Sequence, residues 1–276
     1  MGVYSLDFVE IHRGTVMIKE LSYSAYVLPV RDGKVALLKY GENGYGPIGG
    51  RLEDGEDFKT ALRRELTEEL GESTSALVDN VVDIPVPYAF RHPTPERAQK
   101  RGAYAEEHHF FLVHVPEDMK LTFCEDRPEN ISVIWIDTDE LLSQQITPFD
   151  DMREFYASQI LLNLDCRFSM SLRPEYYEMV KSGEKDIELR LYDEKRRRMH
   201  NGDIVLIYNA QTKNDYIRAK IVRLHIAKSF AELNTKISMP RTGFASLNAL
   251  MTAISKFYDP DTESKYGIVG IELEVI

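Results

Sequence analysis

The sequence predicts an α+β protein made of two domains. A chain of 276 residues is long for one compact domain and sufficient for two. Charge divides it unevenly, because the net charge is −11 overall, −14 for residues 1–165 and +3 from residue 166 onward. The pattern of strand-like and helix-like segments also restarts after residue 165. We therefore expect one domain over residues 1–165 and another over residues 166–276.

The first domain begins with a hairpin signal. Strand-like runs at 22–30 and 34–40 are joined through Asp32-Gly33, a dipeptide that favours a tight turn. After a glycine-rich loop at 41–50, residues 57–70 have helical spacing, and Gly71 ends the helix. The rest of this domain is predicted as strands at 81–88, 109–115 and 131–136, a long loop at 91–107 and a helix at 149–162.

The second domain has several strands, a few helices and no strand–helix–strand rhythm. A first strand at 168–172 precedes a helix at 174–181, which has Pro174 near its first turn and ends at Gly183. The remaining segments are predicted as strands at 186–191, 203–208, 216–226 and 266–275 and helices at 230–233 and 244–257. This pattern suggests a small mixed barrel.

Several classes of protein are disfavoured. No apolar run approaches the roughly 18–20 residues that a membrane helix needs, and the first residues lack the pattern of a secretory signal. The two cysteines, Cys124 and Cys166, form no CxxC pair, which disfavours a disulfide scaffold and fits a reducing compartment. We therefore expect a cytoplasmic protein with no membrane partner.

Glu65, Glu68 and Glu69 are the most informative residues of the predicted helix at 57–70. Their spacing places three carboxylates on one helix face, where like charges cost a few tenths of a kcal/mol per pair unless something positive lies there. Grouped carboxylate oxygens suit Mg²⁺ or Mn²⁺, and Mg²⁺ bound this way keeps positions for water and substrate phosphates. A solvated acidic face is the alternative explanation for these three residues alone.

Four neighbouring residues favour the metal site. Arg64 can reach Glu68 at i+4 and orient it, and Glu56 lies at the start of the helix, where it can meet Arg64. The backbone of Gly49 and Gly50 is bare enough to approach a ligand or to offer a carbonyl oxygen to a metal.

The stretch from Gly50 to Gly71 resembles the Nudix box, G-x5-E-x7-R-E-U-x-E-E-x-G-U. Every fixed position matches except the last, where Glu72 replaces an aliphatic residue, and Ile48 departs from the frequent Pro-Gly-Gly before the box. The resemblance implies a MutT-like hydrolase with an α/β/α sandwich and a mixed sheet over residues 1–165. It also implies a bound metal ion. The implied ligands are Gly49, Glu65, Glu68 and Glu69, and the residues that support these ligands are Arg64, Glu56 and Gly50.

The implied reaction is hydrolysis of a nucleoside diphosphate linked to another group. Metal ions would polarise the phosphoryl oxygens and lower the pKa of the attacking water. A carboxylate would accept the proton of that water, and Glu65 remains an alternative to Glu106 or Glu107 for this base. Tyr45 could stack on a nucleobase and Arg91 could meet a phosphate, although structural roles for both are equally open.

The second half resembles an ASCH domain, which is similar to the RNA-binding PUA barrel. The resemblance is carried by Lys185, Glu188 and Arg190 in a K-x-x-E-x-R element, followed by Gly202-Asp203, and it implies a small β-barrel with helices over residues 166–276. Glu188 and Arg190 share a strand face, so the three side chains could form a polar pocket or a structural salt-bridge network. Relatives that cleave acetylcytidine carry Thr in place of Glu188, which counts against amidohydrolase activity.

We expect a two-domain enzyme. A Nudix domain that depends on Mg²⁺ or Mn²⁺ would cleave a nucleotide-type diphosphate, and the ASCH domain would bind RNA, a nucleotide or a modified nucleoside. The first alternative is a protein that senses a nucleotide and binds RNA without catalysis, although a sensor has no need of all three metal-binding glutamates. The second is an additional, amide-cleaving site around Lys185.

Overall fold

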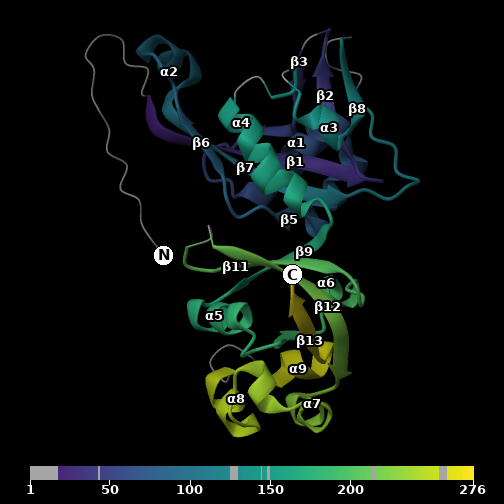
Figure 1. Ribbon diagram of the computed structural model, residues 1–276. Coiled ribbons are helices and arrows are strands. Elements are labelled where there is room, and N and C mark those ends of the chain that lie inside the picture. Colours follow the sequence, from purple (N-terminus) through teal and green to yellow (C-terminus); the bar gives the residue numbers. More distant parts are fainter. Residues whose placement is uncertain are drawn as a thin grey trace. The chain divides into compact units, whose positions relative to one another are not determined.

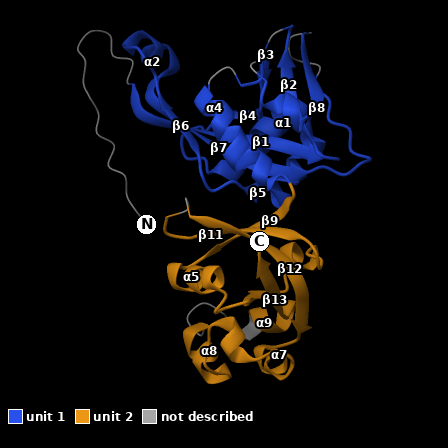
Figure 2. Ribbon diagram, viewed as in Figure 1, with its two compact units in different colours: residues 1–164 blue, residues 165–276 orange. Residues whose placement is uncertain are grey.

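The computed structural model of the chain describes residues 18–42, 44–124, 130–143, 145–147, 150–212, 215–254 and 260–276. The chain divides into two compact units, residues 1–164 and residues 165–276 (Figure 2). Both units mix helices and strands, which confirms the predicted α+β class. Within the described ranges, no helix is both long and apolar enough to cross a membrane.

The first unit is built on an eight-stranded mixed sheet (Figure 1). β1 (Lys19–Arg31) pairs antiparallel with β2 (Lys34–Tyr40) through a turn in which Asp32 and Gly33 have φ of 52° and 74°, so the predicted hairpin is confirmed. On its other side β1 runs parallel to β7 (Ala103–His114). The other strands are β3 (Gly44–Gly46), β4 (Ile48–Arg51), β5 (Val82–Asp83), β6 (Tyr88–Arg91) and β8 (Ile131–Asp137).

Helices cover both faces of this sheet, which confirms the predicted α/β/α sandwich. On one face, α1 (Phe58–Leu70) buries its apolar side, including Leu62 and Leu66, in the main core of the unit. On the other face, Phe110 of β7 lies 5.3 Å, between ring centroids, from Phe155 at the end of α4 (Asp150–Phe155). The remaining helical segments are the 3₁₀ helix Glu72–Asn80, α2 (Pro95–Arg101), α3 (Thr138–Leu141), the π-helix Tyr156–Ile160 and the 3₁₀ helix Leu161–Asn163.

Three predictions for this unit were wrong. The expected loop at 41–50 contains β3 and β4, because both short segments pair with longer strands, β3 with β2 and β4 with β1. The expected strand at 81–88 is only β5 and the first residue of β6. The expected loop at 91–107 contains α2 and the beginning of β7. The first residue of the predicted helix at 149–162 lies outside the described part of the chain. From Asp150 this segment is α4, followed by the π-helix and the last 3₁₀ helix.

The second unit is built on a five-stranded curled sheet, in the order β10-β13-β12-β11-β9, which agrees with the predicted barrel-like class. Its core lies between this sheet and the helices, with Tyr177 and Phe230 among its largest buried side chains. The strands are β9 (Cys166–Leu172), β10 (Ile187–Leu191), β11 (Ile204–Asn209), β12 (Tyr216–Ala227) and β13 (Ile268–Val275). The helical segments are α5 (Pro174–Ser182), α6 (Glu194–Arg197), α7 (Phe230–Lys236), the 3₁₀ helix Met239–Thr242, α8 (Leu247–Ile254) and α9 (Pro260–Tyr266).

Candidate active site

A cap fixes the start of α1, and two glycines allow β4 to pack closely beside it. Asp57 caps the helix, because its Oδ1 accepts a 2.7 Å hydrogen bond from the Thr60 amide. Gly49 has φ of 128°, and a Cβ at this position would collide with the carbonyl of Ala25 on β1. A Cβ on Gly50 would collide instead with the carboxylate of Glu65. The two glycines therefore allow β4 to lie against β1 and the helix carboxylates to lie against β4.

The three glutamates of α1 occupy different environments. Glu69 is buried, with 6% of its surface exposed, and it accepts a 2.9 Å hydrogen bond from the Gly49 amide. Glu65 lies between the backbone of Gly50 and Arg64, whose Nη1 donates to it at 2.8 Å. The side chain of Glu68 is 43% exposed. Two carboxylates are thus held against the glycine backbone, and the third is accessible to solvent.

Arg64 holds this acidic face together. Its Nε and Nη2 donate to the two oxygens of Glu56 at 2.9 and 3.0 Å, and Nη2 also donates to the Arg51 carbonyl at 3.0 Å. Its Nη1 lies 3.7 Å from Glu68, the i+4 partner expected from the sequence. The hydrogen bond to Glu56, helped by Glu65 and opposed by burial, raises the pKa of Arg64 above its usual range. The guanidinium therefore stays charged and offsets the repulsion among the carboxylates.

The donor set suits a hard divalent cation. The described residues contain no group of three His, Cys, Asp or Glu side chains gathered closely enough to hold a metal ion. The oxygens nearest to one another come from Glu65, Glu69 and the glycine backbone, and Glu68 is exposed enough to turn toward them. Carboxylate and carbonyl oxygens are the ligands that Mg²⁺ and Mn²⁺ prefer. The residues therefore fit the predicted metal by their chemistry, and their assignment as ligands stays a prediction.

Glu106 lies in β7 and not at the end of a loop. Its side chain has no exposed surface, and its carboxylate is hydrogen-bonded by Arg51, Arg101, His92 and His108 at 2.8–3.1 Å. Burial alone would raise the pKa of Glu106, but the hydrogen bonds from His108, Arg101 and His92 together with the charge of Arg101 hold it well below its usual range. A carboxylate that is buried and has a low pKa is a poor acceptor for the proton of an attacking water.

Glu107 occupies the opposite face of the sheet. Successive side chains of a strand point to opposite sides, and Glu107 lies with His109, to which it is hydrogen-bonded at 2.6 Å. His109 in turn packs on Phe58 of α1, with 4.1 Å between ring centroids. Glu107 therefore lies on the face that carries α1, and its side chain is 25% exposed. Glu65 and Glu107 remain the candidate bases.

Arg91 lies at the mouth of an aromatic pocket of about 400 Å³ in the first unit. The phenol of Tyr88 donates to Asp151 at 2.9 Å, and burial, with that bond, raises the pKa of Tyr88 to about 12. Arg91 is 75% exposed and pairs with Glu20 at 3.2 Å. Tyr45 is on β3 and is not among the described residues of this pocket, so the structure does not bring the two predicted substrate residues together there. The pocket is lined by Tyr88, Phe90, Arg91, His92, Pro93, Arg97, His108, Asp151 and Met152.

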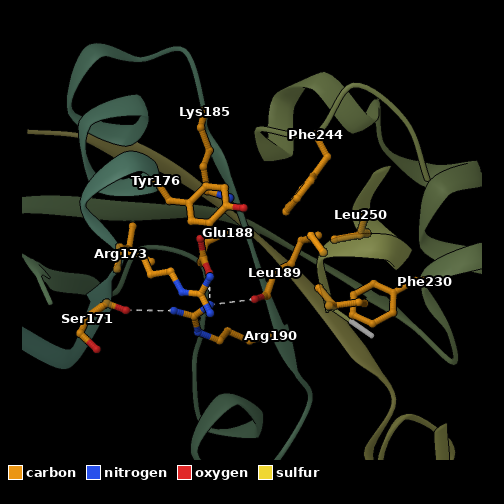
Figure 3. Close-up of a pocket in the computed structure, with 13 residues that line it drawn as sticks. Ser171, Arg173, Tyr176, Lys185, Glu188, Leu189, Arg190, Phe230, Phe244 and Leu250 are labelled. Carbon is orange, nitrogen blue, oxygen red and sulfur yellow. Dashed lines mark hydrogen bonds and ion pairs between the residues drawn. The ribbon is translucent and has the colours of Figure 1, made fainter. Parts of the chain in front are cut away.

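Lys185, Glu188 and Arg190 converge in a pocket of about 280 Å³ in the second unit (Figure 3). The Lys185 Nζ lies 3.1 Å from Glu188 and donates to the Thr242 carbonyl at 2.7 Å, and both charged side chains are buried. Arg190 completes the group, since it hydrogen-bonds Glu188 and the Ser171 carbonyl. Burial lowers the pKa of Lys185, although the charge of Glu188 opposes this. The rest of the lining consists of Arg173, Tyr176 and a set of apolar residues, namely Leu172, Leu189, Phe230, Phe244, Leu250, Ala253 and Ile254.

Residues 195–198 of the second unit form a basic run, Lys-Arg-Arg-Arg, and most of these side chains contact other groups of the protein. Lys195 donates to the Ser169 carbonyl at 3.0 Å, and Arg196 pairs with Asp193 at 2.8 Å. Arg197 donates to the Tyr192 carbonyl at 3.0 Å. Three of its four cations therefore have partners within the protein.

Comparison with known families identifies both units. A family model for the NUDIX domain matches residues 21–159, half of the chain, and one for the ASCH domain matches residues 170–276. The chain belongs to the Nudix family. Both expected resemblances, and their order along the chain, are confirmed. The first unit is accordingly a Nudix pyrophosphohydrolase domain, a class that acts on nucleotide-type substrates and generally uses divalent metal ions.

Several solved structures are similar to parts of this Nudix protein. A solution structure of a protein from Pyrococcus furiosus is 32% identical and covers 40% of this chain and 96% of its own, with a TM-score of 0.33. The E. coli dihydroneopterin triphosphate pyrophosphohydrolase is 18% identical and covers 53% of this chain and 99% of its own, with a TM-score of 0.39. The MutT protein from Methanosarcina mazei Go1 is 23% identical and covers 50% and 94%, with a TM-score of 0.37. No curated protein matches the chain.

The sequence did not reveal the group around Glu106 in this Nudix domain. Its members, Arg51, His92, Arg101 and His108, come from four different elements or loops and are brought together only by the sheet. Arg51 directly follows the two glycines inside the box, and this position was the one available signal.

Proposed function

We propose that the Nudix domain hydrolyses a diphosphate bond in a nucleoside diphosphate linked to another group. It would use Mg²⁺ or Mn²⁺ held by four oxygen donors, Glu65, Glu68, Glu69 and the Gly49 carbonyl. The observation that carries the proposal is the contact of Glu65 and Glu69 with the backbone of Gly49-Gly50, maintained by the Arg64–Glu56 pair. This arrangement places hard donors along one side of α1, and the exposed Glu68 marks where a phosphate can approach.

The reaction needs a Lewis acid and a base. When bound, the cations supply the Lewis acid that polarises phosphoryl oxygens and acidifies a water. The water oxygen forms a bond to one phosphorus, the bond from that phosphorus to the bridging oxygen breaks, and the bridging oxygen leaves with the second phosphate. Glu65 or Glu107 accepts the proton of the water. Glu107 suits the role of a base near solvent, because its side chain is partly exposed. It is also hydrogen-bonded to His109, which can pass the proton onward.

The aromatic pocket at Tyr88 and Phe90 supports a nucleotide as substrate. The two rings lie 5.7 Å apart between centroids, and His108 packs edge-on against Phe90 at 5.1 Å. A nucleobase stacks on such rings and gains a hydrogen-bonding partner in Asp151. Arg91 at the same pocket would contact the ribose or a phosphate.

A substrate screen with matched variants tests this function. Capped RNA, ADP-ribose, dinucleoside polyphosphates and noncanonical triphosphates are incubated with Mg²⁺ or Mn²⁺, and the products are identified. Glu68→Gln is expected to lower kcat at least about 100-fold, because an exposed metal ligand is lost. Glu72→Gln, an exposed acid just beyond the helix, serves as the control and should retain activity. Unchanged turnover in Glu68→Gln contradicts the mechanism, and tight nucleotide binding without product supports the sensing alternative.

For the ASCH domain we propose binding of RNA, a nucleotide or a modified nucleoside in the pocket of Lys185, Glu188 and Arg190. The pocket combines a buried ionic group with aromatic walls, including Tyr176 and Phe244, whose ring centroids lie 5.6 Å apart. Planar bases with polar edges suit such a lining. Calorimetric titration of nucleosides and short RNAs should show binding that Arg190→Gln weakens and that Lys181→Gln, an exposed lysine paired with Asp215, leaves unchanged. Equal affinity in both variants would contradict the assignment, and release of acetate from acetylated nucleosides would support the amide-cleaving alternative.

A further inference from the structure

A positively charged recess lies on the face of the sheet opposite α1, and Gly50 separates it from the Glu65 carboxylate of that helix. It has a volume of about 340 Å³ and is lined by Ser24, Tyr26, Gly50, Arg51, Lys100 and Arg101. Three of these six residues are cationic, although the half of the chain that contains them has a net charge of −14. The cations come from two places, Arg51 from the end of β4 and the other two from the end of α2. Such a concentration of one charge is what an anionic ligand needs.

Buried Glu106 holds the two arginines of this recess in place. It accepts hydrogen bonds from Arg51 at 3.0 Å and from Arg101 at 2.8 and 3.1 Å, so one carboxylate holds both guanidinium groups. Arg51 is further fixed by donating to the Arg101 carbonyl. The two arginine side chains remain 38% and 49% exposed, so their outer faces are accessible to a ligand. With Lys100 also exposed, the formal charge of the group is +2 after Glu106 is counted.

Gly50 connects the recess with the carboxylates of α1. It lines the recess, and its Cα lies against the Glu65 carboxylate on the other side. Arg51 also offers its carbonyl oxygen to Arg64, the residue that orients the glutamates. A phosphate in the recess would therefore be a close neighbour of a phosphate held at the helix.

We propose that Arg51, Arg101 and Lys100 form the subsite for the substrate phosphate that is not attacked, and that Glu106 positions the two arginines for it. The proposal rests on the proposed function, since it assigns the second phosphate of the same diphosphate. Planar guanidinium groups bind phosphate oxygens in pairs, and here the carboxylate fixes their orientation before the ligand arrives. The ligand class is therefore a diphosphate, with one phosphate at the α1 carboxylates that would hold the cation and its other phosphate in the recess.

Binding of inorganic pyrophosphate tests the subsite without relying on catalysis. Calorimetric titrations are made with the full chain in EDTA and again with Mg²⁺. Arg101→Gln and Arg51→Gln are each expected to weaken binding about 10- to 100-fold, because a charged hydrogen-bond donor is lost. Arg101→Lys should lie between them and the wild type. Arg63→Gln is the matched control, since Arg63 is an equally exposed arginine of the same unit that pairs with Asp79.

The variant Glu106→Gln distinguishes a positioning role of Glu106 from a purely electrostatic role. The substitution adds one positive charge to the recess, so a purely electrostatic role of Glu106 would make pyrophosphate bind more tightly. A positioning role makes it bind at least about 5-fold more weakly, because the amide holds the two guanidinium groups less firmly. If this buried substitution prevents folding, the exposed Arg101 variants still decide the proposal.

The outcomes distinguish the subsite from the proposed hydrolysis. If no nucleotide is hydrolysed but pyrophosphate binding depends on Arg101 and Arg51, the subsite stands and the proposed function fails. If nucleotides are hydrolysed and both arginine variants keep the wild-type KM and pyrophosphate affinity, the function stands and the subsite is overturned.

Discussion

Replacing Gly50 by alanine should impair catalysis with little effect on stability. Gly50 does not have a positive φ, so alanine meets no backbone strain there. The three atoms nearest to the added methyl belong to the carboxylate end of Glu65, a flexible side chain that can turn away. We expect the free energy of unfolding to change by less than about 1 kcal/mol, because side-chain relief and the lower entropy of the unfolded chain offset the collision. Moving a proposed metal ligand by about 1 Å should lower kcat about 100-fold.

Gly49→Ala is the matched comparison and should behave in the opposite way. Its φ of 128° is strained for alanine, and its Cβ would meet the Ala25 carbonyl, a backbone atom that cannot turn aside. Strain of about 1–3 kcal/mol and the collision together should cost about 3 kcal/mol or more, which lowers the Tm of the unit by about 6–12 °C.

Tryptophan fluorescence gives the assay for both variants. The chain has one tryptophan, Trp135 of β8, which packs on the main core of the first unit, so its thermal transition follows that unit. Turnover is measured on whichever nucleotide the wild type hydrolyses. Wild-type kcat in Gly50→Ala, or a loss of Tm equal to that of Gly49→Ala, would refute the reasoning.

Three further predictions concern stability and pH. Glu68→Gln should change the free energy of unfolding by less than about 0.5 kcal/mol, because the lost 3.7 Å contact with Arg64 is offset by weaker repulsion on α1; a fall of several degrees in the fluorescence transition would contradict this. Lys185→Met should destabilise the second unit by about 3 kcal/mol in urea unfolding followed by circular dichroism, since it leaves Glu188 buried beside one cation fewer, and adding Glu188→Leu should recover part of the loss. The pKa of Tyr88 is raised from 10.0 to about 12, so the folded protein keeps a proton that the unfolded chain loses, and stability should fall as the pH rises through this window. Ultraviolet titration of the wild type against Tyr88→Phe measures that pKa, and a value near 10 would refute it.

Local signals in the sequence predicted much of the fold. The Asp32-Gly33 turn and the helical spacing at 57–70 each depend on residues close together in the sequence, and both the hairpin and α1 lie where they were expected. β4 was missed because Gly49 and Gly50 are typical of loops, and only pairing with β1 makes the segment a strand. α2 was missed although it carries local signals, since Thr94 caps it, Pro95 opens it and Gly102 ends it with φ of 72°.

Some residues of the candidate site were likewise predictable from local sequence, and others were not. The glutamates of α1 and Arg64 lie within one helical turn or two of each other, so spacing alone predicted which side chains share a face. The recess around Glu106 was not predictable, because Arg51 is 55 residues away in the sequence and Arg101 belongs to a helix that was not expected. Its assembly depends on the register of β7 beside β1, which no local pattern specifies.

That register also explains why two adjacent carboxylates have different chemistry. Glu106 and Glu107 have the same side chain, yet the alternation of β7 sends one to each face of the sheet. Glu106 meets two arginines and two histidines in the interior, where its charge is satisfied and its proton affinity is lost. Glu107 meets His109 on the face of α1 and stays partly exposed. A shift of one residue in this strand would exchange the two environments, so the register of β7 decides which glutamate can serve as a base and which can position arginines for a phosphate.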